Sequence, residues 1–260
     1  MVVFLRIIFL LILFITCEAA LANNAYYITL SNQVARKQEL EIITNNAANS
    51  NTIGYEEDGM IFDKFDVMQN RKKNNSFVVS KAMYKSGEMG PLKQTNNPMD
   101  LAIMEPDQYF KVRTPNGIRY TIAGNMLRNS QGILVNSNGY PYLTLNNDIL
   151  QIPLDAVNIQ ISADATVYAD GIAIERIGVV MIPDKFALAK EGESLYRSAI
   201  PEVPIDDYTV MSGALRMSNV NAARVMSQTI ETQRSFSTTS SLLNNLGDME
   251  KQAVSKHLKQ

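Results

Sequence analysis

The chain has 260 residues, of which 46% are hydrophobic, so it is long enough to bury one large core or two modest ones. Its formal net charge is −2, which excludes the basic surface that a nucleic acid or an anionic membrane would require. Histidine and cysteine occur once each, as His257 and Cys17, which leaves little material for a metal or nucleophile site. We expect no cofactor, no metal, no small-molecule substrate and no catalytic residue.

Residues 1–22 have the pattern of a secretory leader. Arg6 precedes an apolar run over 7–16, and Ala20-Leu21-Ala22 fits a small-residue cleavage site. The run is shorter than the roughly 20 residues that span a bilayer. We expect cleavage after Ala22, which would also remove Cys17. A retained anchor or a lipid on Cys17 is the alternative.

Residues 24–44 show the periodicity of a helix. Tyr27, Leu30 and Val34 share one side, while further apolar residues recur every seven residues on another. A helix with two apolar faces needs more than one neighbour.

Residues 220–258 predict a second, longer helix, with Ser218 or Asn219 as its N-cap. Its apolar residues point in several directions, and many of the intervening residues are Ser or Thr, which are weak helix formers. We therefore expect this helix to become stable mainly on assembly with other chains. The simpler alternative is that it folds back on its own domain.

Between residues 77 and 182 the periodicity changes to short strands separated by turn signals. The strongest signal is the hairpin turn Thr114-Pro115-Asn116-Gly117, and Asn138-Gly139 and Asp170-Gly171 mark further turns. This pattern is typical of a compact antiparallel β domain.

The predicted fold class is α+β, with N- and C-terminal helices forming a coiled-coil-like inner domain beside the antiparallel β domain. The expected boundaries are a leader at 1–22, an N-terminal helix and turn at 23–60, an extended connector at 61–100, the β domain at 101–189, a connector at 190–217 and the C-terminal helix at 218–260.

Two acidic clusters, Glu56-Glu57-Asp58 and Asp206-Asp207, contain the residue type that catalyses glycoside cleavage. Both fall in turn-like stretches without the apolar surround that would raise one pKa. The basic run Arg71-Lys72-Lys73 reads as a solvated loop, and His257 as a surface residue. No enzyme is expected.

Four sequence blocks follow one another along the chain. They are Asn45-Asn46-x-Ala48-Asn49-x-x-Thr52-x-Gly54-Tyr55, the segment 90–103 that begins Gly-Pro-Leu-Lys-Gln-Thr, the block from Tyr109-Phe110 to Gly139-Tyr140-Pro141, and Ser218-Asn219-Val220-Asn221 with the following 230–236. In this order they resemble the signature of the bacterial flagellar rod and hook protein family. Two departures stand out: a leader precedes the family's usual start, and Met104–Gln108 replaces a glycine-containing turn.

The resemblance implies a structural subunit of the flagellar basal body, closest to the proximal rod, in which terminal helices build a helical axial tube that transmits torque. Its implied partners are other copies of itself, other flagellar rod proteins and, transiently, the export machinery, with no nucleic acid. Its implied location is the periplasmic rod, beyond the inner membrane. A distal-rod or hook-type subunit, a secreted β-rich binding module that oligomerises through its helices, and a cell-wall enzyme remain as alternatives.

The assembly interface is expected to include apolar and amide side chains of both helices and the turn after the first. They are Tyr27, Leu30, Val34, Asn45, Asn46, Asn49, Val220, Val225, Met226, Ile230, Gln233, Phe236, Leu243 and Leu246.

Overall fold

The structure is a computed structural model that describes residues 2–68, 74–192, 194–205 and 207–257. Side chains are described from residue 25 onward, except at 64–83, 85, 250, 253, 254, 256 and 257. The side chains of the expected leader and of His257, the basic run Arg71-Lys72-Lys73, and Asp206 therefore lie outside the described residues.

The chain divides into two compact units, between which it passes four times. The helical unit comprises residues 1–45, 59–83 and 223–260, and the β unit comprises 46–58 and 84–222.

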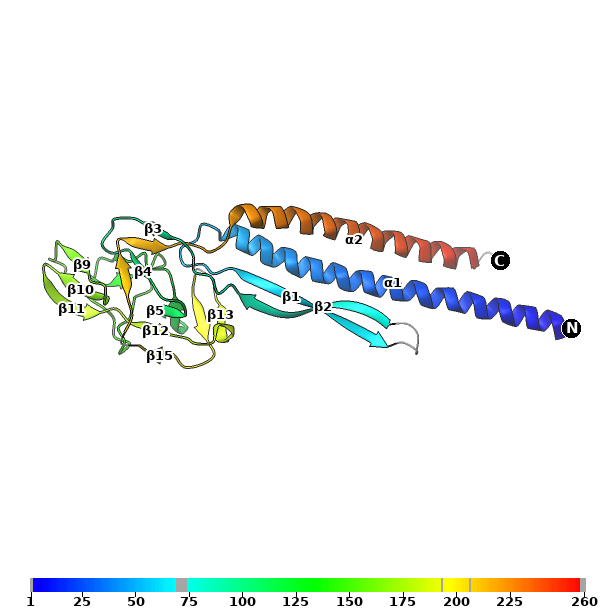
Figure 1. Cartoon of the computed structure of the whole chain (residues 1–260), viewed down its shortest axis with the longest axis horizontal. Helices are drawn as coiled ribbons and strands as arrows, with labels where there is room; N and C mark the ends of the chain where they lie inside the picture. Colours follow the sequence, from blue (N-terminus) through cyan, green and yellow to red (C-terminus); the bar gives the residue numbers. More distant parts are fainter. Residues whose placement is uncertain (1, 69–73, 193, 206, 258–260) are drawn as a thin grey trace. The chain divides into compact units, whose positions relative to one another are not determined.

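The helical unit contains two long helices and one β-hairpin (Figure 1). Helix α1 spans Val2–Ala48 and α2 spans Ala222–His257, and the two run antiparallel, side by side. Gln33 of α1 donates a hydrogen bond of 2.7 Å to the Ser240 hydroxyl of α2. No helix in the described part of the chain is long and apolar enough to cross a membrane.

The hairpin of the helical unit consists of β1 (Asp58–Met68) and β2 (Asn74–Lys85). It occupies much of the stretch 61–100, for which the sequence predicts an extended connector. The backbone there is extended, but it pairs with itself.

Four hydroxyl side chains of α2 bond to the backbone of their own helix. Thr229, Thr238, Thr239 and Ser241 each donate to the carbonyl four residues earlier, at 2.8–3.1 Å. Bonds of this kind do not stabilise a helix, so they do not offset the weak helix propensity of these residues.

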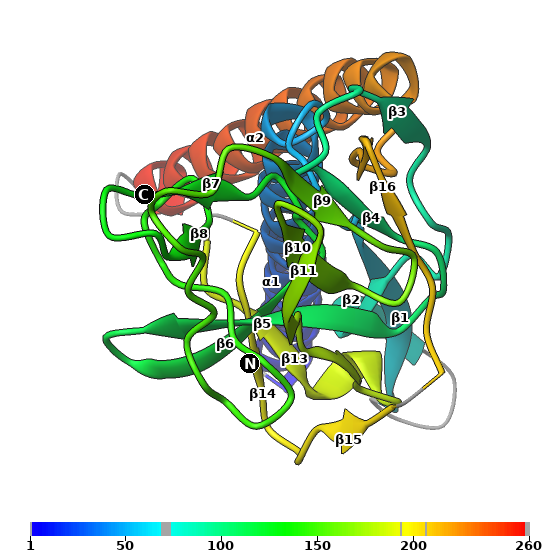
Figure 2. The same ribbon diagram turned by 90° about the vertical axis from the view of Figure 1, so that its left-hand side faces the viewer.

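The largest sheet of the β unit has six strands in the order β13-β14-β6-β5-β12-β15. Their bounds are β5 Gln108–Thr114, β6 Gly117–Thr121, β12 Val179–Met181, β13 Leu188–Lys190, β14 Tyr196–Ser198 and β15 Val203–Pro204. Figure 2 labels β13, β14, β6, β5 and β15 of this sheet.

The predicted hairpin at 114–117 and the predicted turn at 170–171 are confirmed. Strands β5 and β6 pair antiparallel from Phe110 to Gly117, and Gly117 adopts the positive φ of 103° that the turn requires. Strands β10 (Thr166–Ala169) and β11 (Ile172–Arg176) meet at Asp170-Gly171, where φ is 50° and 83°. This pair of positive φ values suits a two-residue hairpin turn.

The remaining strands are short. They are β3 Leu92–Gln94 with β17 Ala214–Arg216, β4 Leu101–Ile103 with β16 Val210–Ser212, β7 Leu127–Arg128 with β8 Leu134–Val135, and β9 Ile159–Ile161 beside β10. A short 3₁₀ helix spans Lys185–Ala187. Strands β14 to β17 fall within 190–217, the segment that the sequence analysis describes as a connector.

The six-stranded sheet is covered on both faces, because successive side chains of a strand point to opposite sides. Phe110 and Val112 of β5 enter a large cluster that also contains Leu101 and Tyr142. Tyr109 enters a second, smaller cluster with Tyr120, Val180 and Tyr196, all of them buried. Burial on both faces explains why β5 lacks the alternation of a half-exposed strand.

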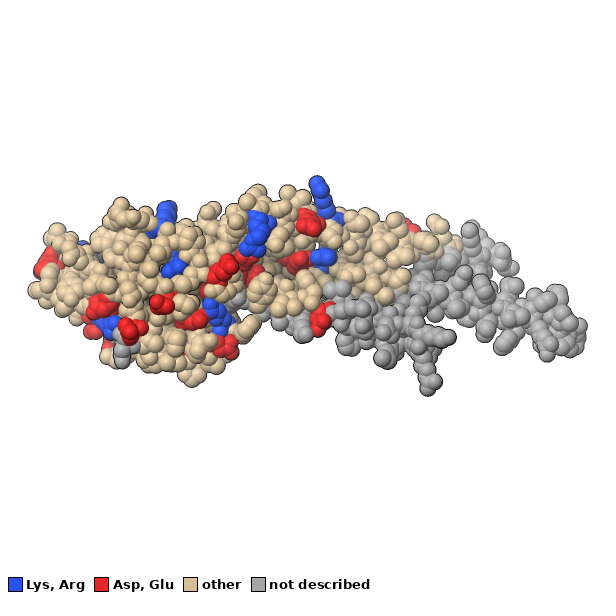
Figure 3. Space-filling view, in the orientation of Figure 1, with Lys and Arg blue, Asp and Glu red and all other residues tan. Residues whose placement is uncertain are grey.

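The α+β class, with two helices and several antiparallel sheets, is confirmed. The coiled-coil pairing of the terminal helices stays a prediction. Acidic and basic side chains are interspersed on the visible face of the β unit (Figure 3), as the small net charge leads one to expect.

Candidate assembly site

Three of the sequence motifs meet at one place in the β unit. We call this place the clasp and define it by Asn46, Tyr55, Gly90, Arg216 and Asn219. All five lie close to points where the chain leaves the β unit. The clasp therefore joins the segments of the β unit at which the chain enters and leaves it.

Asn46 is the first anchor of the clasp and is only 2% exposed. Its amide nitrogen donates to the Asp58 carbonyl at 2.7 Å, and its amide oxygen accepts from the Asp58 amide at 3.1 Å and from the Tyr55 hydroxyl at 2.9 Å. One side chain thus closes the turn between α1 and β1.

Asn219 joins that turn to the two other segments. Its amide oxygen accepts from the Glu57 amide at 2.7 Å, and its amide nitrogen donates to the Glu88 carbonyl at 2.8 Å. The Ser218 hydroxyl accepts from the Val220 amide at 3.2 Å. Helix α2 begins only at Ala222, so the expected N-cap at Ser218 or Asn219 is wrong. The Asn219 side chain belongs to the clasp instead.

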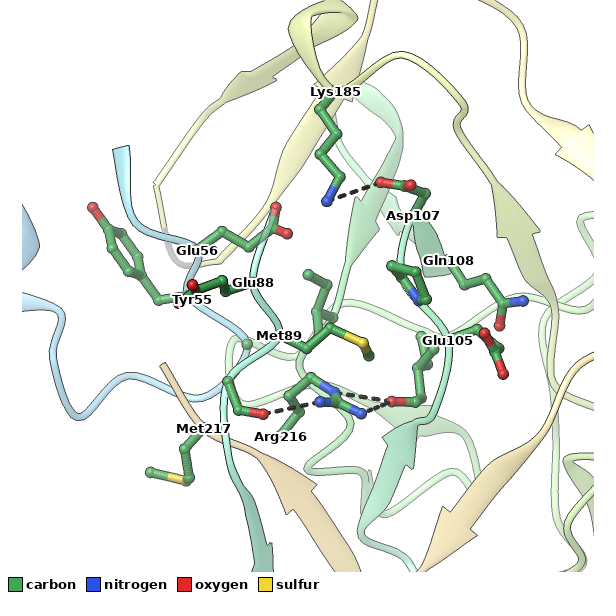
Figure 4. A pocket seen from close by; sticks show the side chains of 15 residues that line it. Tyr55, Glu56, Glu88, Met89, Glu105, Asp107, Gln108, Lys185, Arg216 and Met217 are labelled. Carbon is green, nitrogen blue, oxygen red and sulfur yellow. Dashed lines mark hydrogen bonds and ion pairs between the residues drawn. The ribbon is translucent and has the colours of Figure 1, made fainter. Parts of the chain in front are cut away.

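Arg216 is a buried residue of the clasp and lines a shallow pocket together with Glu105 and Met217 (Figure 4). Its guanidinium donates twice to the Ile103 carbonyl, at 2.5 and 2.9 Å, and once to the Gly90 carbonyl at 2.9 Å. Burial lowers the pKa of Arg216 below its ordinary value. The side chain ties β17 to β4 and to the segment before β3.

Lys190 of β13 fastens the sheet to the first motif. Its ammonium donates to the Glu56 carbonyl at 2.5 Å and to the Asp58 carboxylate at 2.6 Å, and lies 3.9 Å from the centre of the Tyr55 ring. Burial lowers the pKa of Lys190, opposed by Asp58. Burial and the nearby acidic groups raise the pKa of Tyr55, so its hydroxyl keeps the proton that it donates to Asn46.

These contacts give the acidic cluster 56–58 a structural role. Asp58 pairs with Lys190, and Glu56 is buried beside the clasp. Among the residues whose side chains are described, no group of three or more His, Cys, Asp or Glu could hold a metal ion.

The expected interface residues fall into exposed, intermediate and buried sets. Exposed are Tyr27, Leu30, Val34, Asn45, Met226, Ile230 and Gln233; intermediate are Asn49, Phe236 and Leu246; buried are Asn46, Val220, Val225 and Leu243. The buried set packs inside this chain. The part that these residues take in assembly stays a prediction.

Two segments of the chain match models of protein families. Residues 103–169 match "Flagellar hook protein FlgE/F/G D1 domain", and residues 211–256 match "Flagellar basal body rod FlgEFG protein C-terminal". The flagellar basal-body rod protein FlgF of Caulobacter vibrioides is 30% identical over 240 residues, which cover 90% of this chain and 98% of the relative. The chain belongs to the flagellar basal-body rod protein family.

Other members of the family give the same picture. FlgF of Rhizobium meliloti is 31% identical over 86% of this chain and 93% of its own, and FlgG of Bacillus subtilis is 28% identical over 89% and 98%. The predicted resemblance is confirmed, and with it a structural rather than enzymatic role in the flagellar basal body.

The family motifs contain four of the five clasp residues, Asn46, Tyr55, Gly90 and Asn219. They do not contain Arg216, nor Lys190, which binds next to the clasp. A lone basic residue in a short strand carries no signal of burial, so neither cation could be singled out from the sequence.

Proposed function

We propose that this chain is a subunit of the proximal rod and that exposed faces of its two helices bind other copies of itself and other rod proteins. The observation that carries the proposal is apolar surface on α1 and α2 that nothing in the described chain covers. Such surface is removed from water when subunits associate.

On α1 the apolar surface is a narrow stripe. At about 100° per residue, Tyr27, Leu30 and Val34 fall within an arc of about 60°. All three are exposed, and the same face continues with the ion pair between Lys37 and Glu41. The stripe suits one neighbouring helix.

On α2 one face is buried within the chain and its flank is apolar. Val225, Thr232 and Leu243 are buried and point in the same direction from the axis of α2, within about 20°. Met226 and Ile230 point about 100–140° away from that direction, on one side of it. They are 65% and 54% exposed.

The opposite flank of α2 is apolar as well, although Leu242 and Met249 were not among the expected interface residues. Around the axis of α2 they lie about 100–120° from the buried residues Val225, Thr232 and Leu243, on the side opposite to Met226 and Ile230. Both are exposed. Two exposed apolar flanks require at least two neighbours around α2. Contacts that repeat head to tail without closing give a filament, which is the form a torque-transmitting rod requires.

The test is assembly in cells that lack the native gene. Ile230→Asp should abolish rod assembly and motility, because the carboxylate would be buried unpaired against a neighbour. Gln228→Asp is the matched control: it places the same charge two residues away at an exposed polar position and should preserve motility. Motility retained by Ile230→Asp, with normal protein levels, would count against the proposal.

A distal position in the same rod is the alternative, since FlgG of Bacillus subtilis also covers 89% of the chain. Immunogold labelling of isolated basal bodies tests the position along the rod. We expect label at the cell-membrane end, and label at the hook end would favour the distal position.

We further propose that the chain crosses the inner membrane and loses residues 1–22 as a leader, because Arg6, the apolar run and Ala20-Leu21-Ala22 have the required order. The intact mass of the protein purified from its native cell tests this. The expected first residue is Asn23, and a species that retains Cys17 would contradict cleavage.

A further inference from the structure

A short segment forms a strap along one edge of the six-stranded sheet. The strap, residues 199–205, contains β15, which pairs with β12 at Val180↔Pro204 and Met181↔Val203. Strand β15 is the last in the sheet order, so the strap covers the edge of β12. Proline at 204 offers no amide hydrogen, which makes the strap a poor template for a further strand.

The strap is fixed at both ends by apolar contacts. Ile200 packs on the smaller core cluster, and Ile205 packs on the larger one. The Ser198 hydroxyl bonds the Ile200 carbonyl at 2.6 Å, which sets the bend into the strap. Between these ends, the polar anchor is Glu202.

Glu202 reaches a fully buried ammonium. The Lys111 ammonium donates to the Glu202 carboxylate at 3.0 Å, to the Asn147 side-chain oxygen at 2.7 Å and to the Leu145 carbonyl at 2.9 Å. Lys111 is 0% exposed, and Glu202 is the carboxylate that pairs with it. Because an unpaired buried charge is strongly unfavourable, the closed strap and the buried lysine depend on each other.

The other carboxylate oxygen of Glu202 is also held. The Tyr120 hydroxyl of β6 donates to it at 2.7 Å. Burial, and after it the hydrogen bond to Glu202, raises the pKa of Tyr120, so the phenol remains a donor. Both oxygens of one carboxylate therefore bind the strap to two neighbouring strands.

We propose that Glu202 is a latch that holds the strap over β12, and that opening the latch frees β12 to pair with β12 of a second copy. The uncovered edge would be Val179-Val180-Met181. The two valines favour strands, and all three side chains are apolar. Strand β12 already pairs antiparallel with β15, and two copies of one strand related by a two-fold axis also pair antiparallel. The latch thus protects the subunit from edge-to-edge association that does not involve the helices.

Amide hydrogen exchange and sedimentation of the full chain test the latch. Glu202→Ala should speed exchange at 199–205 and 179–181 by about tenfold or more, since a charged hydrogen-bond partner is lost. It should also increase the dimer fraction above that of the unchanged chain. The matched control is Glu191→Ala, which removes a carboxylate that pairs with Arg119 and Arg197 on the same sheet. It should change neither quantity at the strap.

If Glu202→Ala fails to fold, Tyr120→Phe is a milder variant that tests the same latch. Tyr120→Phe removes the hydroxyl bond to Glu202 and keeps the ring in its cluster, so exchange should rise at the same residues by a smaller factor. An unchanged exchange rate at 199–205 in a folded Tyr120→Phe chain would overturn the latch. Faster strap exchange without any gain in dimer would overturn the pairing of β12.

Discussion

The Tyr55 hydroxyl donates a hydrogen bond of 2.9 Å to the amide oxygen of Asn46, nine residues earlier in the chain. The same oxygen accepts from the Asp58 amide, so a single buried side chain fixes both ends of the turn from α1 into β1. Asn46 and Asn219 reach this turn from opposite ends of the sequence. The helices are therefore connected to a β unit whose exits are held by its own hydrogen bonds.

Asn46→Ala should destabilise the β unit by about 2–4 kcal/mol, because it removes three hydrogen bonds: a buried one from the Tyr55 hydroxyl and two partly buried ones with the Asp58 backbone. Chemical denaturation followed by near-UV circular dichroism measures the free energy of unfolding. Asn51→Ala, at an exposed position in the same turn, is the control and should stay within about 0.5 kcal/mol. Equal effects of the two changes would show that the Asn46 bonds do not stabilise the fold.

The sequence predicted where the clasp residues stand but not what they do. Asn46 was expected at the assembly interface through its motif, and the structure shows an amide satisfied inside the chain. A sequence alone cannot distinguish an amide that binds its own backbone from one that binds a neighbour, because both occur in turns rich in asparagine.

Gly90→Ala should disrupt the clasp, whereas Gly87→Ala should not. An added Cβ at Gly90 would overlap the Met217 carbonyl, but at Gly87 it would meet nothing within 4 Å. Neither glycine has a positive φ, so the comparison isolates the steric effect. We expect Gly90→Ala to lower the free energy of unfolding by about 1–3 kcal/mol, as overpacking does. Thermal or urea unfolding of the two variants measures the difference in stability. Similar unfolding midpoints would contradict the close approach of Gly90 to Met217.

Strand prediction succeeded best beside a turn with a clear sequence signal. Asn116-Gly117 located β5 and β6, because the turn between them needs positive φ. Asp170-Gly171 marked the turn after β10, but β11 itself was not predicted as a strand. The strands within 190–217 were missed because they have two or three residues each, too few to show a period of two. Tertiary pairing, which a single sequence does not display, forms them.

The carboxyl group of Asp164 should have a low pKa, which a pH titration can measure. Hydrogen bonds from the Ser162 and Thr166 hydroxyls lower the pKa of Asp164 from 3.8 to about 2. Because the folded value lies below the unfolded one, these bonds add stability above about pH 3.8 that is lost as the pH falls towards 2. An NMR titration of the carboxyl carbon should give a midpoint near 2, and Ser162→Ala should move it up towards 3.8. A midpoint of 3.8 in the unchanged chain would contradict the hydroxyl contacts.

The two long helices bury little in the single chain. In α2, the described side chains that are nearly inaccessible are Val225, Thr232 and Leu243. One hydrogen bond, from Gln33 to Ser240, joins α2 to α1 among the described contacts between them. Because most helix stability in proteins comes from packing, a helix of 36 residues with so small a buried face is marginal alone.

The amides of α2 should therefore exchange with solvent much faster in the free chain than those of β5 and β6, which serve as the reference within the same molecule. Strands β5 and β6 pair over five residue pairs and β5 is buried on both faces, so their exchange should require unfolding of the β unit. In assembled rods, where neighbours would cover Met226 and Ile230, the α2 amides should become protected. Hydrogen exchange with mass spectrometry on both forms measures the difference. If α2 in the free chain is protected as strongly as β5, the helix is stable without neighbours, and its exposed apolar flanks need another explanation.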